Sequence, residues 1–158
     1  GRVTPVDERV LGYQIHALGS NRYASTCTPE FRDRHFGKGV SAQALAQAPV
    51  LVFNRKDDMQ ARFARRMAGV EVPNTAPTWW IPSTRAFVQA NLGGLGWTMN
   101  PLPLVKRHLD AGRLVYVRQR AWEDVPLYWQ HWKGDVQTMA LLTRAVLGAS
   151  TALIRRKR

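Results

Sequence analysis

A run of four consecutive apolar residues, Val50 to Phe53, constrains the fold more than any other stretch of this sequence. An uninterrupted apolar run of this length predicts a strand that is covered on both faces. The following residues, 57–69, place Met or Phe at every fourth position and end at a glycine, which predicts an amphipathic helix. A strand followed by a helix is the repeating unit of an α/β fold.

The same alternation is found in the rest of the chain. Further strands are expected over 12–19, 22–28, 78–81, 96–99, 113–117 and 126–132, and further helices over 30–36, 42–47, 84–92, 101–112 and 135–154. We therefore predict a mostly parallel sheet with helices on both faces. In such folds ligands bind at the carboxyl ends of the strands.

The net charge of +12 makes nucleic acid the first partner to consider, because clustered lysines and arginines displace counterions from phosphates. The one dense basic run, 155–158, is a terminal tail, and the chain has no helix-turn-helix, RNA-recognition or zinc pattern. One function to weigh is therefore that of a basic interaction module, which contacts nucleic acid directly; it is kept as the alternative to the function given below. The sequence lacks both a signal peptide and an apolar run long enough for a membrane span, so we expect a cytoplasmic protein without a membrane partner.

Residues that catalyse reactions or bind metals are not found at the required spacings. Cys27 is the only cysteine, and no Asp or Asn is placed to orient a histidine beside it. The histidines do not follow a metal-binding spacing, and GGLGW is not a phosphate-binding loop. We predict that the chain is not an enzyme and that it holds no cofactor or metal.

Polar side chains follow several of the predicted strands, at the points where helices begin. Asn54 follows the first apolar run, Ser83 and Thr84 follow the strand at 78–81, and Asn100 follows the next strand. A helix start offers free N–H groups and the positive end of the helix dipole to an anion such as a ligand carboxylate. The same residues are also good helix caps, and the two interpretations are compatible.

Two adjacent carboxylates and three tryptophans are also candidates for a binding site. Asp57 and Asp58 are either a helix cap and a solvated charge, or one of them holds a cationic ligand group through charge-assisted hydrogen bonds. Trp79, Trp80 and Trp97 either line a cleft or belong to the core.

Five stretches of the sequence carry a resemblance to a known family. They are HALGSNRYASTCTPEFRDRHF, APVLVFNRKDDMQ, STRAFVQANLGGLGWTMNP, LVKRHLDAGRLVYV and LYWQHW. Over residues 12–149 the chain resembles the carboxyl-terminal half of LysR-type transcription regulators. It is most similar to their arginine/lysine-responsive branch, to which FNRKDDMQ and GLGWTMNP are more specific.

The resemblance implies an α/β effector domain of the periplasmic-binding-protein-like type II fold, with two lobes joined by crossing strands and the effector between them. This chain would be truncated to the second lobe, the hinge strands and the carboxyl-terminal helix. Residues 1–28 would hold the end of lobe I and the first crossing strand, and residues 29–125 would be lobe II. Residues 126–158 would hold the second crossing strand, the helix returning to lobe I and the basic tail.

The resemblance also implies a function. The chain would sense lysine or arginine and control basic amino-acid export genes, as part of a dimer or tetramer. Operator DNA would be bound by an amino-terminal winged helix-turn-helix that this sequence does not contain. Arg85 stands where several relatives carry an acidic residue, which leaves its role open. The effector-binding residues would be Asn54, Asp57, Asp58, Trp80, Ser83, Thr84 and Trp97.

Overall fold

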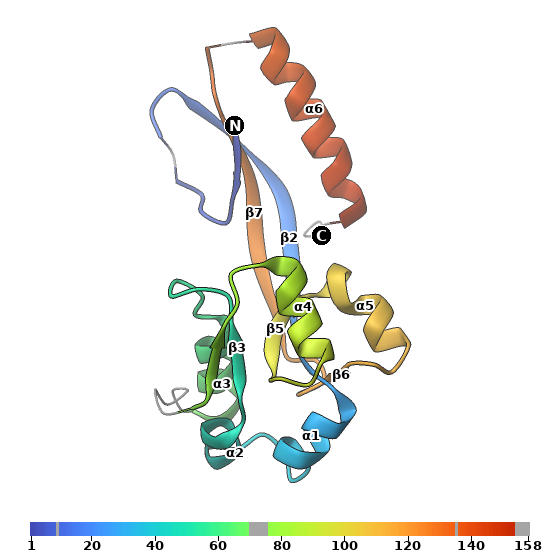
Figure 1. Cartoon of the computed structure of the whole chain (residues 1–158). Coiled ribbons are helices and arrows are strands. Elements are labelled where there is room, and N and C mark those ends of the chain that lie inside the picture. The colour runs from blue at the N-terminus through green and yellow to red at the C-terminus, as the bar shows by residue number, and fades with distance from the viewer. Residues whose placement is uncertain (9, 70–75, 135, 154–158) are drawn as a thin grey trace. The chain divides into compact units, whose positions relative to one another are not determined.

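The computed structural model describes residues 1–8, 10–69, 76–134 and 136–153. The chain forms two compact units (Figure 1). The terminal unit combines Gly1–Arg22 with Asp124–Arg158, and the central unit is Tyr23–Glu123. The predicted basic tail, 155–158, lies outside the described residues.

Two long strands, β2 (Tyr13–Cys27) and β7 (Trp122–Trp132), contribute residues to both units. β2 runs without a break over Tyr13–Cys27, where two separate strands, 12–19 and 22–28, were expected. In the terminal unit β1 (Arg2–Thr4) pairs antiparallel with β7. The helix α6 (Val136–Leu153) contacts β7: the indole N–H of Trp129 on β7 donates to Thr143 Oγ1 on α6 at 2.9 Å.

Five helices of the central unit match the predicted ones closely. They are α1 (Pro29–Phe36), α2 (Ala42–Gln47), α3 (Met59–Ala68), α4 (Thr84–Leu92) and α5 (Leu102–Asp110). Three of them begin at a hydroxyl cap: Thr28, Ser41 and Ser83 each accept a hydrogen bond from a backbone N–H in the first helical turn. α3 ends at Gly69, whose φ of +66° is a left-handed conformation that glycine adopts without strain.

The prediction of a mostly parallel sheet is wrong. Among the described residues, parallel pairing joins β3 (Val50–Val52) to β4 (Thr78–Trp80), and a parallel bridge joins Val50 to Trp97. β5 (Thr98–Pro101) and β6 (Val115–Tyr116) both pair antiparallel with β2. A helix between two strands sets their direction only when those strands become neighbours. In this chain β5 and β6 both pair with β2. Residue patterns along the sequence do not reveal which strands pair.

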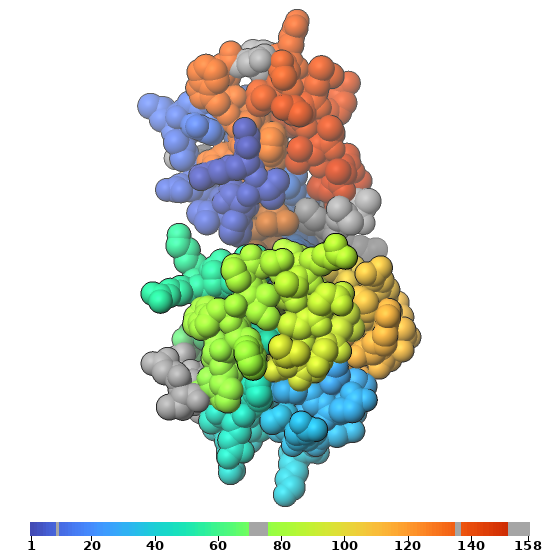
Figure 2. All heavy atoms as spheres, in the orientation of Figure 1, coloured from blue at the N-terminus to red at the C-terminus, as the bar shows by residue number. Residues whose placement is uncertain are grey.

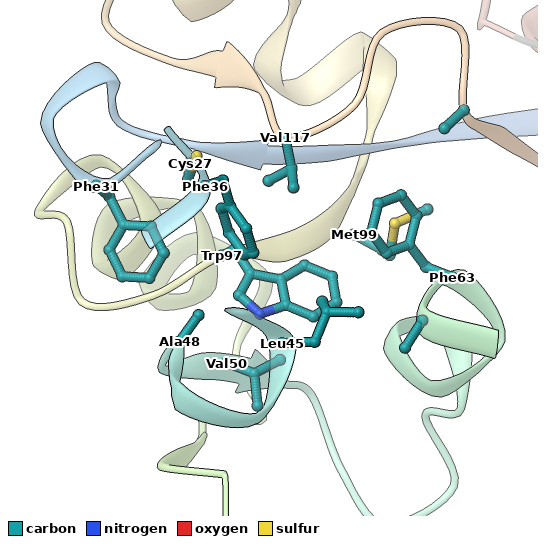
Figure 3. Close-up of a cluster of buried hydrophobic side chains, with 12 residues drawn as sticks. Cys27, Phe31, Phe36, Leu45, Ala48, Val50, Phe63, Trp97, Met99 and Val117 are labelled. Atoms are coloured by element: carbon teal, nitrogen blue, oxygen red, sulfur yellow. The ribbon is translucent and has the colours of Figure 1, made fainter. Parts of the chain in front are cut away.

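The main core of the central unit is built around Trp97, which is completely buried (Figure 3). Its ring lies 5.3 Å from that of Phe63 on α3 and 6.4 Å from that of Phe36 on α1. A smaller cluster joins α4 and α5 through Val88 and Val105. Within the described ranges, no helix has both the length and the apolar character needed to cross a membrane.

Candidate functional site

The strands β3 and β4 run parallel, so their carboxyl ends lie at the same edge of the sheet. Val52 pairs with Trp80, and the backbone N–H of Ile81 donates to the Val52 carbonyl at 3.0 Å. Asn54 therefore follows one strand, and Ser83 follows the other, at this shared edge. In Figure 1 the loops after β3 and β4 and the start of α4 lie at the same end of the central unit.

The loop after β3 packs against the first turns of α4. The ring of Phe53 meets the ring of Phe87 edge to face, with centroids 5.9 Å apart. Phe87 is buried, and its backbone N–H donates to the Ser83 carbonyl at 2.8 Å. The two loops thus lie at the same edge of the β3–β4 sheet, where this aromatic contact joins the loop after β3 to α4.

Asp57 and Asp58 differ in their surroundings. Asp57 is half-buried and accepts hydrogen bonds from the backbone N–H groups of Phe53 at 3.0 Å and Met59 at 3.2 Å. Asp58 is exposed and forms an ion pair with Arg62, one helical turn later, at 3.1 Å. Asp57 therefore holds the loop in shape, while the carboxylate of Asp58 faces solvent.

The start of α4 is open to solvent. Ser83, Thr84 and Arg85 are all exposed, and the Ser83 hydroxyl accepts from the Ala86 N–H at 3.4 Å. Trp80, just before this turn, exposes 56% of its surface. Figure 2 shows the segment of β4 and α4, in green, at the surface of the central unit. Asn54 is also exposed, and its side chain accepts from the Lys56 N–H at 2.8 Å.

The structure does not bring Trp97 to this surface. Trp97 is completely buried in the main core, and it contacts Phe36 and Phe63 instead of the polar edge residues. Cys27 lies in the same core, where burial raises the pKa of its thiol to about 12. A thiol with that pKa stays protonated near neutral pH, so it is not an activated nucleophile.

The buried side-chain amide of Gln60 lies behind the edge and fixes its shape. Residue patterns in the sequence did not identify Gln60 as a functional residue. Its side-chain N–H₂ group donates to the Leu51 carbonyl at 2.9 Å, to Thr98 Oγ1 at 3.2 Å and to Asp57 Oδ2 at 3.3 Å. It thereby links β3, β5 and the loop before α3. A glutamine in the first turn of a helix carries no sequence signal for this role.

A second buried network anchors α4. Asn91, at the other end of α4, donates to the carbonyls of Thr26 at 3.1 Å and Gly96 at 2.8 Å. Its Oδ1 accepts from Thr26 Oγ1 at 2.8 Å and from the Asn100 side-chain amide at 3.0 Å. Asn100 is completely buried. The expectation that Asn100 follows the strand is wrong, because Asn100 lies within β5 and its side chain points into the buried network.

The arrangement suits recognition of a small polar molecule more than catalysis. A helix start with exposed hydroxyls can receive a carboxylate, and the exposed carboxylate of Asp58 in the loop after β3 can receive a cation. Within the residues that the structure describes, no group of three or more His, Cys, Asp and Glu could hold a metal ion.

Comparisons with known proteins identify the family to which the chain belongs. Residues 4–141 match the family described as "LysR substrate binding domain". The chain is 38% identical over 155 residues to the HTH-type transcriptional regulator LysG of Mycobacterium tuberculosis, a match covering 98% of this chain and 50% of LysG. The chain spans about half the length of the curated relatives it matches.

Two solved structures are similar in fold. One is the structure of the C-terminal domains of a LysR family protein from Agrobacterium tumefaciens, with a TM-score of 0.93, 42% identity, and coverage of 98% of this chain and 74% of that one. The other is full-length LysG from Corynebacterium glutamicum with bound effector Arg. It has a TM-score of 0.86 and 31% identity, and the match covers 97% of this chain and 51% of LysG.

Proposed function

This chain belongs to the LysR substrate-binding domain family, and from that premise we propose that it is the effector-sensing part of a LysR-type transcription regulator. The relatives named above are transcriptional regulators, so the chain is proposed to act by binding and not by catalysis. Family membership does not favour the alternative, a module that contacts nucleic acid directly.

The proposed effector is arginine or lysine, and the proposed targets are basic amino-acid export genes. Support comes from the 31% identity to Corynebacterium glutamicum LysG, whose structure contains Arg as its effector. The exposed start of α4 at the carboxyl edge of β3 and β4 is the observation that carries the proposal. It offers hydroxyls and free N–H groups to the carboxylate of an amino acid.

The cationic end of the effector is proposed to meet the carboxylates after β3. Asp58 is the more accessible, because its side chain is exposed and its i,i+4 pair with Arg62 contributes only about 0.3–0.5 kcal/mol. Releasing Arg62 therefore costs little. The Asp57 carboxylate already accepts hydrogen bonds from backbone N–H groups, and it has further lone pairs that can accept from a ligand. Asn54 and Trp80 would complete the edge, and Trp97 supports it from the core.

The wider organisation is also a proposal. Residues 29–125 would form lobe II, residues 1–28 and 126–158 the crossing strands with part of lobe I. The split into two compact units, with β2 and β7 belonging to both, supports this division. Operator DNA would be bound by a winged helix-turn-helix outside this sequence, in a cytoplasmic dimer or tetramer.

Calorimetric titration of the intact regulator with arginine and with lysine tests the proposal. We expect Ser83→Ala to weaken binding by about three- to tenfold, because a hydroxyl hydrogen bond contributes roughly 0.5–1.5 kcal/mol. Ser41→Ala is the matched control, since Ser41 caps α2 in the same way and lies outside the proposed site.

If neither arginine nor lysine gave any heat of binding, the proposed effector would be overturned. Equal affinities for the Ser83→Ala variant and the unmodified regulator would remove the start of α4 from the site. A parallel loss in Ser41→Ala would trace the effect to helix stability instead of effector contact.

A further inference from the structure

A pocket of about 390 Å³ lies in the central unit, away from the edge described above. Its walls include Arg66 and Met67 at the end of α3, and Arg118, Arg120 and Trp122 from the segment between β6 and β7. The proposed effector site begins at the start of the same helix. The helix rises by about 1.5 Å per residue, so Met67 lies about 12 Å along the axis from Met59. The two sites are distinct.

The pocket carries an excess of positive charge. Arg66 pairs with Glu123 at 3.0 Å, and Glu123 also faces Arg62 at 3.3 Å. Arg118 and Arg120 are exposed, and neither guanidinium forms an ion pair within the described part of the chain. Two positive charges at this pocket are therefore not neutralised by a carboxylate.

Arg120 holds a backbone conformation that arginine rarely adopts. Its φ is +60°, and among the described residues it is the only residue other than glycine with a positive φ. Glycine holds this conformation at lower cost because it has no Cβ. Strained residues of this kind are frequent where a side chain contacts a ligand.

The segment that carries the arginines is held in place by the sheet. The backbone N–H of Val117 donates to the Ser25 carbonyl at 3.0 Å, and that of Arg118 donates to Ser25 Oγ at 3.3 Å. The Trp122 ring packs edge to face on Tyr116, with centroids 5.1 Å apart. The pocket is thus preformed on one side.

We propose that this pocket is a second ligand site, which takes a small organic anion. Arg118 and Arg120 would hold its phosphate or carboxylate group, since the guanidinium fork matches both in geometry. Trp122 and Met67 would contact an apolar or aromatic body attached to that group. The volume suits a small molecule, being within the range typical of ligand pockets.

Titration of the full chain with phenyl phosphate, inorganic phosphate and phenol, followed by NMR, tests the proposal. Phenyl phosphate is expected to bind more tightly than either of its parts. Arg120→Gly is expected to weaken that binding by roughly tenfold, since a charge-assisted hydrogen bond is lost, while thermal stability is unchanged or higher. Arg118→Ala is expected to weaken it similarly.

Arg34→Ala is the matched control, because Arg34 is an exposed arginine of α1 that lines none of these walls. It removes the same charge and is expected to leave the affinity within about twofold, as long-range charge effects are screened. Equal losses in Arg34→Ala and Arg120→Gly would reduce the effect to general charge attraction and overturn the proposal. Unchanged affinity in both Arg120→Gly and Arg118→Ala would overturn it too.

Discussion

At the residue scale, the two adjacent carboxylates before α3 do different work. Asp57 closes the turn after β3, because its oxygens accept from two backbone N–H groups and from the Gln60 amide. Asp58 only pairs with Arg62 across an exposed helical turn. The difference depends on which carboxylate points back at Phe53, and not on the residue type.

Replacing each carboxylate by its amide separates these roles. Asp57→Asn turns an N–H₂ group toward donors that need an acceptor, so we expect unfolding to become easier by about 1–3 kcal/mol. Asp58→Asn removes only an exposed ion pair and is expected to cost about 0.3–0.5 kcal/mol. Urea denaturation of both variants measures the difference. Similar losses would show that the hydrogen bonds of Asp57 contribute little to the fold.

The residue patterns identified much of the edge but could not sort its members by burial. Ser83, Thr84 and Asn54 are exposed next to strand ends, where sequence reasoning expected them. Trp97 was also a candidate site residue, yet it is completely buried. Side chains alternate along a strand, so assigning faces requires knowing which face the core covers, and that depends on α1 and α3.

At the element scale, α4 is anchored at one end and open at the other. Asn91 bonds to Thr26 on β2, to Asn100 on β5 and to the Gly96 carbonyl, all of them buried. Its opposite end, at Ser83, carries the exposed groups of the proposed site. A buried network that fixes the helix also fixes the direction in which its first N–H groups point.

Removing Asn91 is expected to cost far more than removing an exposed asparagine. Asn91→Ala removes the hydrogen bonds that Asn91 donates to two buried carbonyls and takes away the acceptor of the buried Thr26 hydroxyl, so we expect a loss of about 2–4 kcal/mol, from roughly 1–3 kcal/mol per group left unpaired. Asn54→Ala is the control, because Asn54 is exposed and accepts a single hydrogen bond. Equal changes in the midpoint of thermal unfolding for the two variants would contradict the anchoring role.

Helices were easier to anticipate than the sheet. α2 and α4 begin directly after the serines that cap them, and both span the residues expected, 42–47 and 84–92. Caps and periodicity are local, so they can be read along the chain. Strand pairing is not local: β2 meets β5 and β6 across long stretches of sequence, and β1 was not anticipated at all.

At the scale of the whole molecule, β2 and β7 are the strands that belong to both units. Arg22 is the last residue of β2 in the terminal unit, and Asp124 is the first residue of β7 there. The Arg22 guanidinium donates two hydrogen bonds to the Asp124 carboxylate, each at 2.6 Å. The hydrogen bond to Asp124 raises the pKa of Arg22. Both strands are thus tied together where they pass into the central unit.

A double-mutant cycle with Arg22→Ala and Asp124→Ala measures the strength of this tie. Exposed ion pairs contribute about 0.2–1 kcal/mol, and we expect a coupling near the upper end because the pair is bidentate. Asp124 is about half exposed, with 44% of its side chain accessible, so solvent screening keeps the value from rising further. The pair Lys106 and Asp110, exposed on α5, is the matched control and is expected to couple more weakly, because both side chains are screened by solvent. Urea unfolding of the four variants in each cycle gives both values. Equal couplings would mean that the bidentate geometry of Arg22 and Asp124 adds nothing to an ordinary surface pair.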